Sequence, residues 1–573
     1  MYVKVTTSGP RRYVQLIESF RDDDGRVKKR TVATLGRADQ ISGELDSVID
    51  GLLKVAGREP AKLAPAISAS SLTFEAARAL GNVWTLSEIW KELGFSDLRR
   101  IFRRTRHTID VEALVRIMVL NRLCDPDSKL GVLRWLQTVA LPDIEIKAVT
   151  HQQLLRSMDA LMDNQDEVDG VVAGLLRPLV DLDLSLAFYD MTTIRAEGLS
   201  TVEGDVRKFG MAKEGLIAKQ FMLGVVQTAD GLPIYHEVFD GNTAEAKTLL
   251  PILKKVLERF PNLRRLILVA DRGLLSLDNL DELRKLTLPS GQALEFILAV
   301  PGRRYSEFVE LLNPLQQQCI QASAEITAEV AWNDLRLVLA HDPATALEQR
   351  QKRQTRINEL QSQANAWVGK LDEQDLGAKK RGRKLSDSGA KARFYHEVRE
   401  CRLGNIIKVN LKDELFNYAV DEGALRLAEM MDGKLLVVTN VKDIEPAKII
   451  ERYKSLADIE RGFKVLKSEL ADLGFCQIGP VYHRLPERIR AHASICFMAL
   501  ILHRVMRMRL RAGNTGVTPE RALQTLKRIQ HHRVSINGAE PLSGVSSITE
   551  EDSKVFKALK VKQPSQNQQM TLL

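Results

Sequence analysis

The sequence predicts a multidomain α/β protein, and three observations lead to this fold class. Its 573 residues exceed what one compact core usually holds, because single domains have about 100–200 residues. Hydrophobic residues make up 44% of the chain and charged residues 27%, a balance typical of globular proteins. The apolar pattern also changes along the chain, from two-residue alternation to helical spacing and back. Several domains of different type are therefore expected.

The first part of the chain predicts a small β-meander followed by helices. Apolar and polar residues alternate in three segments that turns separate, namely Tyr2–Val5, Tyr13–Ile17 and Val32–Leu35. From about residue 61 to residue 180 the apolar residues recur at helical spacing, as in Ala113–Leu120 and Leu154–Leu161. A β-rich domain followed by a helical domain is the simplest arrangement that fits both patterns.

The middle of the chain predicts a mixed sheet with the element order β-β-β-α-β-α-β. The predicted strands are residues 182–190, Phe221–Val226, Pro233–Phe239, Leu266–Ala270 and Glu295–Val300. The run Leu266–Ala270 is short and fully apolar, which is typical of a strand buried on both faces. Between the third and fourth strands, an amphipathic helix is expected over Thr243–Phe260, with Thr243 as its N-cap.

A long segment then separates this sheet from two further helices. Residues 301–440 hold a predicted strand at Leu335–Ala340, a polar helix near 344–371, a basic linker at 379–384 and a strand at Lys434–Thr439. Helices are expected over about 445–470 and from Pro486 onward. We therefore divide the chain into six parts: a β-rich domain (1–60), a helical domain (61–180), the first part of the core (181–300), an α+β insertion domain (301–440), the second part of the core (441–515) and a basic, polar C-terminal region (516–573).

Charge and cysteine content restrict the class of protein. The formal net charge is +9, which permits binding to a polyanion such as DNA without requiring it. The five cysteines are scattered and form no C-x-x-C pair, which favours reduced thiols in the cytoplasm. The N-terminus has no signal-peptide pattern, and the apolar stretch 491–501 ends at His503-Arg504. We expect a cytoplasmic protein without a membrane partner, in which this stretch is a buried helix.

Two aspartates stand where predicted strands of the sheet end. Asp190 ends the first strand, and Asp271 directly follows the apolar run Leu266–Ala270. Open sheets place ligands beyond the carboxyl ends of their strands, so both aspartates are candidates for a functional site. An aspartate at a strand end is also a common turn former, and Asp271 can form an ion pair with Arg272 instead.

A third carboxylate, Glu460, lies on the predicted helix over 445–470. Tyr453, Glu460 and Lys467 are seven residues apart, so they lie within about 40° of one another on the helix wheel. They run along the edge of an apolar stripe, formed by Leu456, Ile459, Phe463, Leu466 and Leu470. The arrangement fits a site at the surface of the core, and it also fits a solvated helix flank.

These three carboxylates indicate a hard divalent cation if they converge. Oxygen ligands without a Cys/His cluster suit Mg²⁺ or Mn²⁺ and do not suit Zn²⁺. Two such ions about 4 Å apart would activate a hydroxyl and stabilise the leaving oxygen at a phosphorus atom. The chain has neither the phosphate-binding loop of the P-loop NTPases nor the G-x-S-x-G motif of α/β-hydrolases. Metal-dependent phosphoryl transfer is therefore the chemistry that we predict.

At these residues the sequence resembles the DDE transposases. The strand order with Asp190, Asp271 and Glu460 resembles their RNase H-like core. Tyr453, Glu460 and Lys467 match the signature Y-x2-R-x3-E-x6-K of the bacterial insertion-sequence branch named after IS-four, although Leu456 stands where that signature has Arg. Three further stretches are similar to the family, namely Phe239–Thr243, Val269–Gly273 and Pro480–His483.

The resemblance implies a DNA transposase with an RNase H-like α/β core interrupted by an insertion domain. It implies that Asp190, Asp271 and Glu460 are catalytic and hold Mg²⁺ or Mn²⁺, that the substrates are terminal inverted repeats and target DNA, and that a homodimer forms the synaptic complex. We expect DNA contacts from Tyr453, Lys467, Arg484, Arg488 and Arg490, with these arginines on the carboxylate side of the core. Two alternatives remain: a catalytically inactive DNA-binding protein derived from a transposase, and an RNase H-like nuclease that does not transpose.

Overall fold

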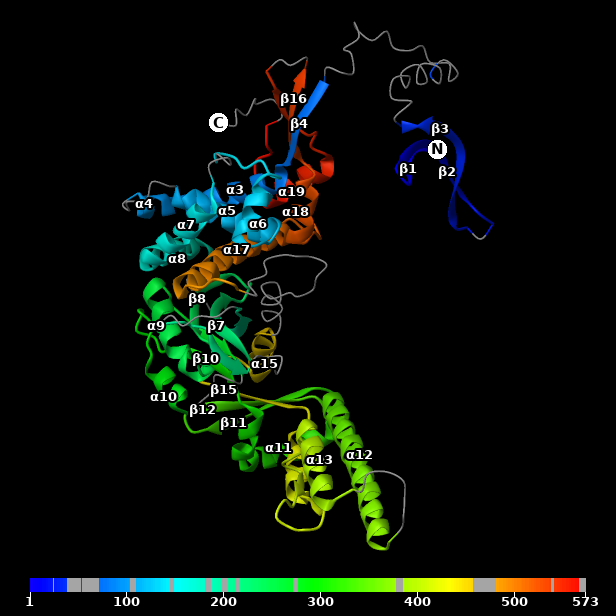
Figure 1. Cartoon of the computed structure of the whole chain (residues 1–573). Helices are drawn as coiled ribbons and strands as arrows, with labels where there is room; N and C mark the ends of the chain where they lie inside the picture. The colour runs from blue at the N-terminus through cyan, green and yellow to red at the C-terminus, as the bar shows by residue number, and fades with distance from the viewer. Residues whose placement is uncertain are drawn as a thin grey trace. The chain divides into compact units, whose positions relative to one another are not determined.

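The protein is described here from a computed structural model of the whole chain (Figure 1). The structure describes residues 1–23, 25–38, 53, 72–103, 110–144, 149–180, 187–197, 203–211, 217–271, 277–377, 385–456, 481–536 and 540–565. The chain forms two compact units, and each is considered by itself. The first unit is Met1–Glu75 with Arg533–Leu542, and the second is Ala76–His532 with Ser543–Leu573.

The first unit begins with a three-stranded antiparallel sheet, which confirms the predicted β-meander. Its strands are β1 (Tyr2–Ser8), β2 (Arg11–Arg21) and β3 (Val27–Arg37), in that order across the sheet. Two register shifts interrupt the pairing of β2 with β3. Most side chains of the three strands are partly or fully exposed, and only Ile17 is buried.

The second unit contains a layer of helices in the region predicted to be helical. These elements are α3 (Gly81–Leu93), η2 (Phe95–Asp97), α4 (Leu98–Phe102), α5 (Val111–Cys124), α6 (Lys129–Leu136), α7 (His151–Asp163), α8 (Gln165–Leu176) and η4 (Arg177–Leu179). Side-chain N-caps at Asp110, Ser128 and Thr150 begin α5, α6 and α7. The cap at Thr150 is part of a capping box with Gln153.

A long apolar helix, α17 (Pro486–Ala512), joins the helical layer to the sheet. It contacts α5 and α7 on one side and strand β8 (Pro233–Asp240) on the other, as Figure 1 shows. Among the described residues it is the one helix long and apolar enough to cross a membrane, and 94% of its most apolar window is buried inside the protein. The sequence-based expectation of a buried helix is therefore confirmed.

Two parts of the chain differ from the predicted division. Leu72–Ala79, inside the predicted helical domain, is strand β4, because it joins a sheet of order β17-β16-β4 with residues far along the chain. The C-terminal region predicted only as basic and polar contains α18 (Pro519–Lys527), β16 (Gln530–Ile536), β17 (Leu542–Val545) and α19 (Glu550–Leu559). The buried side chains of Leu523, Leu526 and Phe556 attach these helices to the main core.

The central sheet has the strand arrangement of an RNase H-like core, which confirms the predicted fold class. Its strands include β5 (Ala187–Arg195), β6 (Lys208–Met211), β7 (Ile217–Thr228), β8, β9 (Ile267–Ala270) and β10 (Glu295–Ala299). β5 pairs antiparallel with β7, and β7 pairs antiparallel with both β6 and β8. On the other side, β5 pairs parallel with β9, and β9 pairs parallel with β10.

The helices that connect these strands are η5 (Glu245–Lys247), α9 (Leu249–Arg259) and α10 (Leu277–Lys285). The prediction of Thr243 as the N-cap of the first helix is wrong, because α9 begins after Thr248. Pro251 explains the later start: proline is tolerated in the first turn of a helix, but it would have disrupted the interior of a helix that began near residue 243.

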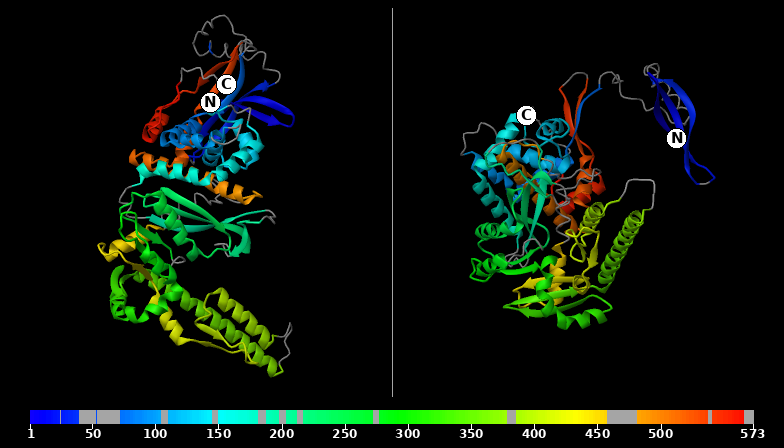
Figure 2. Two further views of the ribbon diagram at one scale, coloured as in Figure 1. Left: turned by 90° about the vertical axis from the view of Figure 1, so that its left-hand side faces the viewer. Right: turned by 60° about the horizontal axis from the view of Figure 1, so that its bottom comes forward.

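The predicted insertion domain is partly continuous with the central sheet. Strands β11 (Ile326–Trp332), β12 (Leu335–His341) and β15 (Lys434–Thr439) extend that sheet from β10 in the order β11-β12-β15-β10. The remaining elements are η7 (Gly302–Phe308), α11 (Val309–Gln321), α12 (Pro343–Asp375), α13 (Asp387–Glu400), β13 (Ile407–Val409), β14 (Tyr418–Val420) and α14 (Glu422–Met431). Helices α12 and α13 lie side by side (Figure 2) around their own apolar cluster, which includes Leu360 and Phe394.

Candidate functional site

The two aspartates predicted from strand ends lie at equivalent positions on neighbouring strands. Asp190 is in β5, and Asp271 directly follows the last residue of β9. The parallel register pairs Ala187 with Leu268 and continues to Tyr189 with Ala270. Asp190 and Asp271 are the next residues along each strand. Because paired strands are about 4.8 Å apart, the backbones of the two aspartates are neighbours although 81 residues separate them in sequence.

A helix of the second core segment covers one face of the sheet next to Asp271. This helix, α15 (Pro446–Lys454), begins with a proline in its first turn, which suits proline because the first N–H groups of a helix have no partner within it. Its residues Ile449 and Ile450 are buried against Phe188 of β5 and Val269 of β9, in a cluster separate from the larger core. Packing of these apolar side chains fixes the last turn of α15 near the end of β9.

Tyr453 in that last turn contacts Asp271 directly. The Tyr453 hydroxyl donates a hydrogen bond of 2.9 Å to the Asp271 carboxylate, and both side chains are partly buried. The bond joins residues 182 positions apart and orients the carboxylate. The sequence predicted Tyr453 as a DNA contact; in the structure its hydroxyl supports one of the predicted metal ligands. A hydrogen bond to a ligating carboxylate is a usual way of orienting a metal ligand.

The third carboxylate falls outside the described residues. Glu460 and Lys467 belong to residues 457–480, and the side chain of Asp190 is likewise outside what the structure describes. Within the described part of the chain, no group of three or more His, Cys, Asp or Glu side chains could hold a metal ion. Convergence of Asp190, Asp271 and Glu460 on one volume therefore stays a prediction.

The three predicted arginines lie in and after a segment that begins at Val481, beyond the end of β5. Val481 pairs with Ala196, six residues past Asp190. The Arg488 guanidinium forms two hydrogen bonds to Asp159 of α7, of 2.7 and 2.8 Å, and Arg490 donates a 3.4 Å bond to the Val238 carbonyl. Arg484 is exposed. Their predicted role in DNA binding stays a prediction.

A buried arginine fastens this segment to the sheet. The Arg207 guanidinium forms a 2.9 Å ion pair with Asp205 and donates hydrogen bonds to the carbonyls of His483 (3.1 Å) and Arg484 (3.0 Å). Its side chain is almost completely buried. Acceptors from two distant parts of the chain suit the fixed fork of a guanidinium, which a lysine could not replace. The position of Arg484 relative to the core therefore depends on Arg207.

Comparison with protein families decides the class of the protein. Residues 182–502, more than half of the chain, match the model of the transposase DDE domain, and residues 3–65 match the N-terminal domain of the IS1634 family of transposases. The chain belongs to the DDE transposase family. The matched range includes both aspartates and the Tyr453 helix, so the resemblance to insertion-sequence transposases is confirmed.

Other comparisons with the transposase add little. No curated protein matches it. A solved structure of a piggyBac transposase synaptic complex with hairpin DNA is similar over 78% of each chain, with 10% sequence identity and a TM-score of 0.34. This distant likeness carries no argument about the site.

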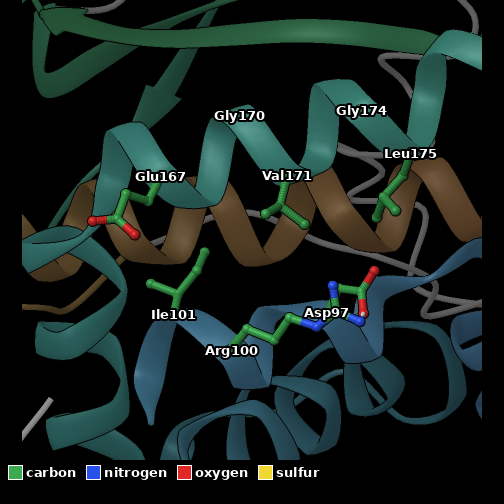
Figure 3. A pocket seen from close by; sticks show the side chains of 8 residues that line it. All are labelled: Asp97, Arg100, Ile101, Glu167, Gly170, Val171, Gly174 and Leu175. Atoms are coloured by element: carbon green, nitrogen blue, oxygen red, sulfur yellow. Dashed lines mark ion pairs between the residues drawn. The ribbon is translucent and has the colours of Figure 1, made fainter. Parts of the chain in front are cut away.

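Among the described residues of the transposase, two cavities lie in or beside the helical layer. The first, of about 600 Å³, lies between α8 and the η2–α4 segment, where Val171 and Leu175 face Ile101 and Arg100 (Figure 3). It contains none of the predicted residues, and Arg100 is paired with Asp97 at 3.3 Å. The second, of about 540 Å³, is lined by Arg484, Arg488 and a buried lysine, Lys129. Sequence reasoning missed Lys129, because a lysine after an N-cap serine has no distinguishing pattern.

Proposed function

We propose that this transposase cleaves DNA at the terminal inverted repeats of its own insertion sequence and joins the ends to target DNA. The observation that carries the proposal is the register of β5 and β9, which makes Asp190 and Asp271 neighbours beside α15. Asp190 follows Phe188 by two positions, and Asp271 follows Val269 by two. Since such positions share one face of a sheet, we assign Asp271 to the face that Val269 shares with α15, and the backbone of Asp190 is its neighbour on β5.

Asp190, Asp271 and Glu460 would together hold two divalent ions, either Mg²⁺ or Mn²⁺. The donor set fits, because Asp271 offers carboxylate oxygens that Tyr453 orients, and hard divalent cations prefer oxygen ligands. When bound, such ions activate the attacking hydroxyl and stabilise the leaving oxygen at phosphorus. The protein residues position the carboxylates: α15 packs on the sheet through Ile449 and Ile450, and Tyr453 keeps the Asp271 carboxylate in one orientation.

Membership of the DDE transposase family supports a proposal for the substrate and the assembly. We propose that two copies of the transposase bind two transposon ends in the cytoplasm and form a synaptic homodimer. Lys467 and Arg490 are proposed as contacts to backbone phosphates, because both side chains are positively charged and can neutralise a phosphate. Arg488 is available for such a contact only if DNA competes with Asp159 for its guanidinium.

The experiment that tests the proposal is cleavage of a labelled duplex carrying the inverted repeat that flanks the gene. Asp271→Asn and Glu460→Gln preserve shape and remove the negative charge that the cation requires, so cleavage in Mg²⁺ or Mn²⁺ should fall on the order of a hundredfold or more. DNA binding in a gel shift should persist, because no basic residue changes. The matched control is Asp372→Asn on the exposed surface of α12, which should cleave normally.

Other outcomes identify the two alternative functions. Cleavage without joining of the ends to a target plasmid would indicate a nuclease that does not transpose. Binding to the ends without cleavage by the unaltered protein in either metal would indicate an inactive DNA-binding descendant. Equal cleavage by Asp271→Asn and the unaltered protein would remove the metal role of Asp271.

A further inference from the structure

The second cavity carries an unusual excess of positive charge. It lies between the start of α6, the end of α5, α7 and the segment that leads into α17. Arg122, Lys129, Arg484 and Arg488 line it, together with the imidazoles of His151, His483 and His492. Burial and the positive charges of Lys129 and Arg488 lower the pKa of His483 to about 3, so the neutral imidazole persists among cations.

Lys129 is the most deeply buried of these cations. It is the first residue of α6, directly after the N-cap Ser128, and it is only 5% exposed. Within the described part of the chain, its ammonium group has no hydrogen bond and no ion pair. Burial, followed by repulsion from Arg122, lowers the pKa of Lys129 to about 7. A buried ammonium without a counter-charge is unfavourable, so the site is built for a ligand that supplies one.

The carboxylates near the cavity are already used by other cations. Asp127 lines the cavity, but its carboxylate pairs with Arg134 at 3.3 Å, and its backbone carbonyl accepts a hydrogen bond from Arg122. Asp159 accepts both bonds from Arg488. Neither carboxylate is hydrogen-bonded to Lys129. The missing negative charge must therefore come from outside this part of the protein.

The surroundings of Lys129 suit a phosphate group. The cavity contains the first turn of α6, where the helix dipole favours an anion, while the N–H of Gly131 is already bonded to the Ser128 hydroxyl at 3.1 Å and the N–H of Ser128 to Asp127 at 2.5 Å. Lys129, Arg122 and Arg484 provide side-chain donors. At the rim, Tyr482 is 71% exposed, which offers a stacking surface for a base or sugar attached to the phosphate. A volume of about 540 Å³ admits a phosphate and part of its nucleotide, but not a duplex.

We propose that this cavity binds a phosphate group of the DNA backbone through Lys129, at a place separate from the catalytic carboxylates. The inference rests on the proposed function, because it takes DNA as the substrate. Val481 of the cavity pairs with Ala196, which is six residues beyond Asp190 along the extended chain. At about 3.3 Å per residue this is about 20 Å. With about 3.4 Å per base pair, this distance between Val481 and Asp190 spans about six base pairs, so we expect the bound phosphate at about that separation from the cleaved bond.

The test replaces Lys129 with methionine, which keeps a similar length and removes the charge. Binding of a labelled inverted-repeat duplex is measured by fluorescence anisotropy between about 50 and 200 mM salt, without divalent metal. Loss of one phosphate contact should reduce the slope of log K against log salt by about 0.9 and weaken binding about tenfold at the lowest salt. The matched control is Lys554→Met on α19, an exposed lysine outside the cavity, which should leave both quantities unchanged.

A second measurement locates the phosphate. Ethylation of single phosphates in the duplex should interfere with binding of the unaltered transposase at a position about six base pairs from the cleavage site. The same ethylation should not affect Lys129→Met. A melting curve of Lys129→Met shows whether the variant is folded, and we expect its melting temperature not to fall.

The possible failures have different meanings. If the unaltered protein does not bind the inverted repeat, the proposed function itself is wrong. If it binds, and folded Lys129→Met binds with the same affinity and salt slope, only the cavity proposal is overturned. If inorganic phosphate raises the melting temperature of the unaltered protein but not of Lys129→Met while DNA affinity is unchanged, the cavity takes free phosphate and the DNA proposal is likewise overturned.

Discussion

Replacement of Lys129 by methionine should make the DNA-free transposase more stable. The pKa of this lysine falls from 10.5 to about 7 because of its burial and the nearby charge of Arg122. Each tenfold shift in a protonation equilibrium corresponds to 1.36 kcal/mol, so the charged ammonium costs about 4–5 kcal/mol of folding free energy near pH 7. Water that enters the cavity relieves part of this penalty. We expect Lys129→Met to raise the free energy of unfolding by about 2–4 kcal/mol.

The pH dependence provides the check on this reasoning. Between about pH 7 and 10.5 the unfolded chain holds a proton on Lys129 that the folded protein has lost, so the stability of the unaltered protein rises with pH through that window. The advantage of Lys129→Met should therefore be largest near pH 7 and shrink toward pH 10.5. Denaturant unfolding can be followed by tryptophan fluorescence, to which Trp135, buried on α6 itself, contributes. A variant less stable than the unaltered protein at pH 7, or a difference independent of pH, would refute the argument.

Two further predictions concern the supports of the site. Tyr453→Phe removes the hydroxyl that donates to Asp271 but keeps the ring. We expect the affinity for Mn²⁺, measured by calorimetry, to fall about tenfold with little change in melting temperature. An unchanged affinity would mean that the bond does not orient a metal ligand. Arg207→Ala removes the buried guanidinium that pairs with Asp205 and that binds the carbonyls of His483 and Arg484. We expect a loss of about 3–5 kcal/mol in unfolding free energy, whereas a loss below about 1 kcal/mol would show that the segment is held by other contacts.

Much of the core could be predicted from the sequence, because its strands have distinct local patterns. Strand β9 is buried on both faces, as the lack of polar alternation in its sequence predicted. The strands β7 and β8 are separated by a short turn at Asp230-Gly231, so their pairing is local. The same reasoning found α17, which has the length and apolar content of a membrane span but is buried as a core helix.

The failures share a physical cause, which is pairing between distant parts of the chain. Leu72–Ala79 has the alanine, glutamate and arginine content of a helix, yet it is strand β4 because β16, more than 450 residues later, offers it hydrogen-bond partners. Intrinsic propensity is a weak preference that such tertiary contacts override. Distant pairing also joins the segment 301–440 to the central sheet, because β15 pairs with β10.

The candidate site shows the same division between local and distant information. The strand ends indicated Asp190 and Asp271 as candidates, and the helix wheel placed Tyr453 at the edge of an apolar stripe. Neither pattern could indicate that the Tyr453 hydroxyl donates to Asp271, because that contact depends on how Ile449 and Ile450 seat α15 on the sheet. Lys129 could not be predicted as a site residue, because its local sequence is ordinary. Only the surrounding fold, which buries its charge, makes it unusual. A residue of this kind is recognised by the absence of a partner in the part of the fold that the structure describes, which no sequence pattern records.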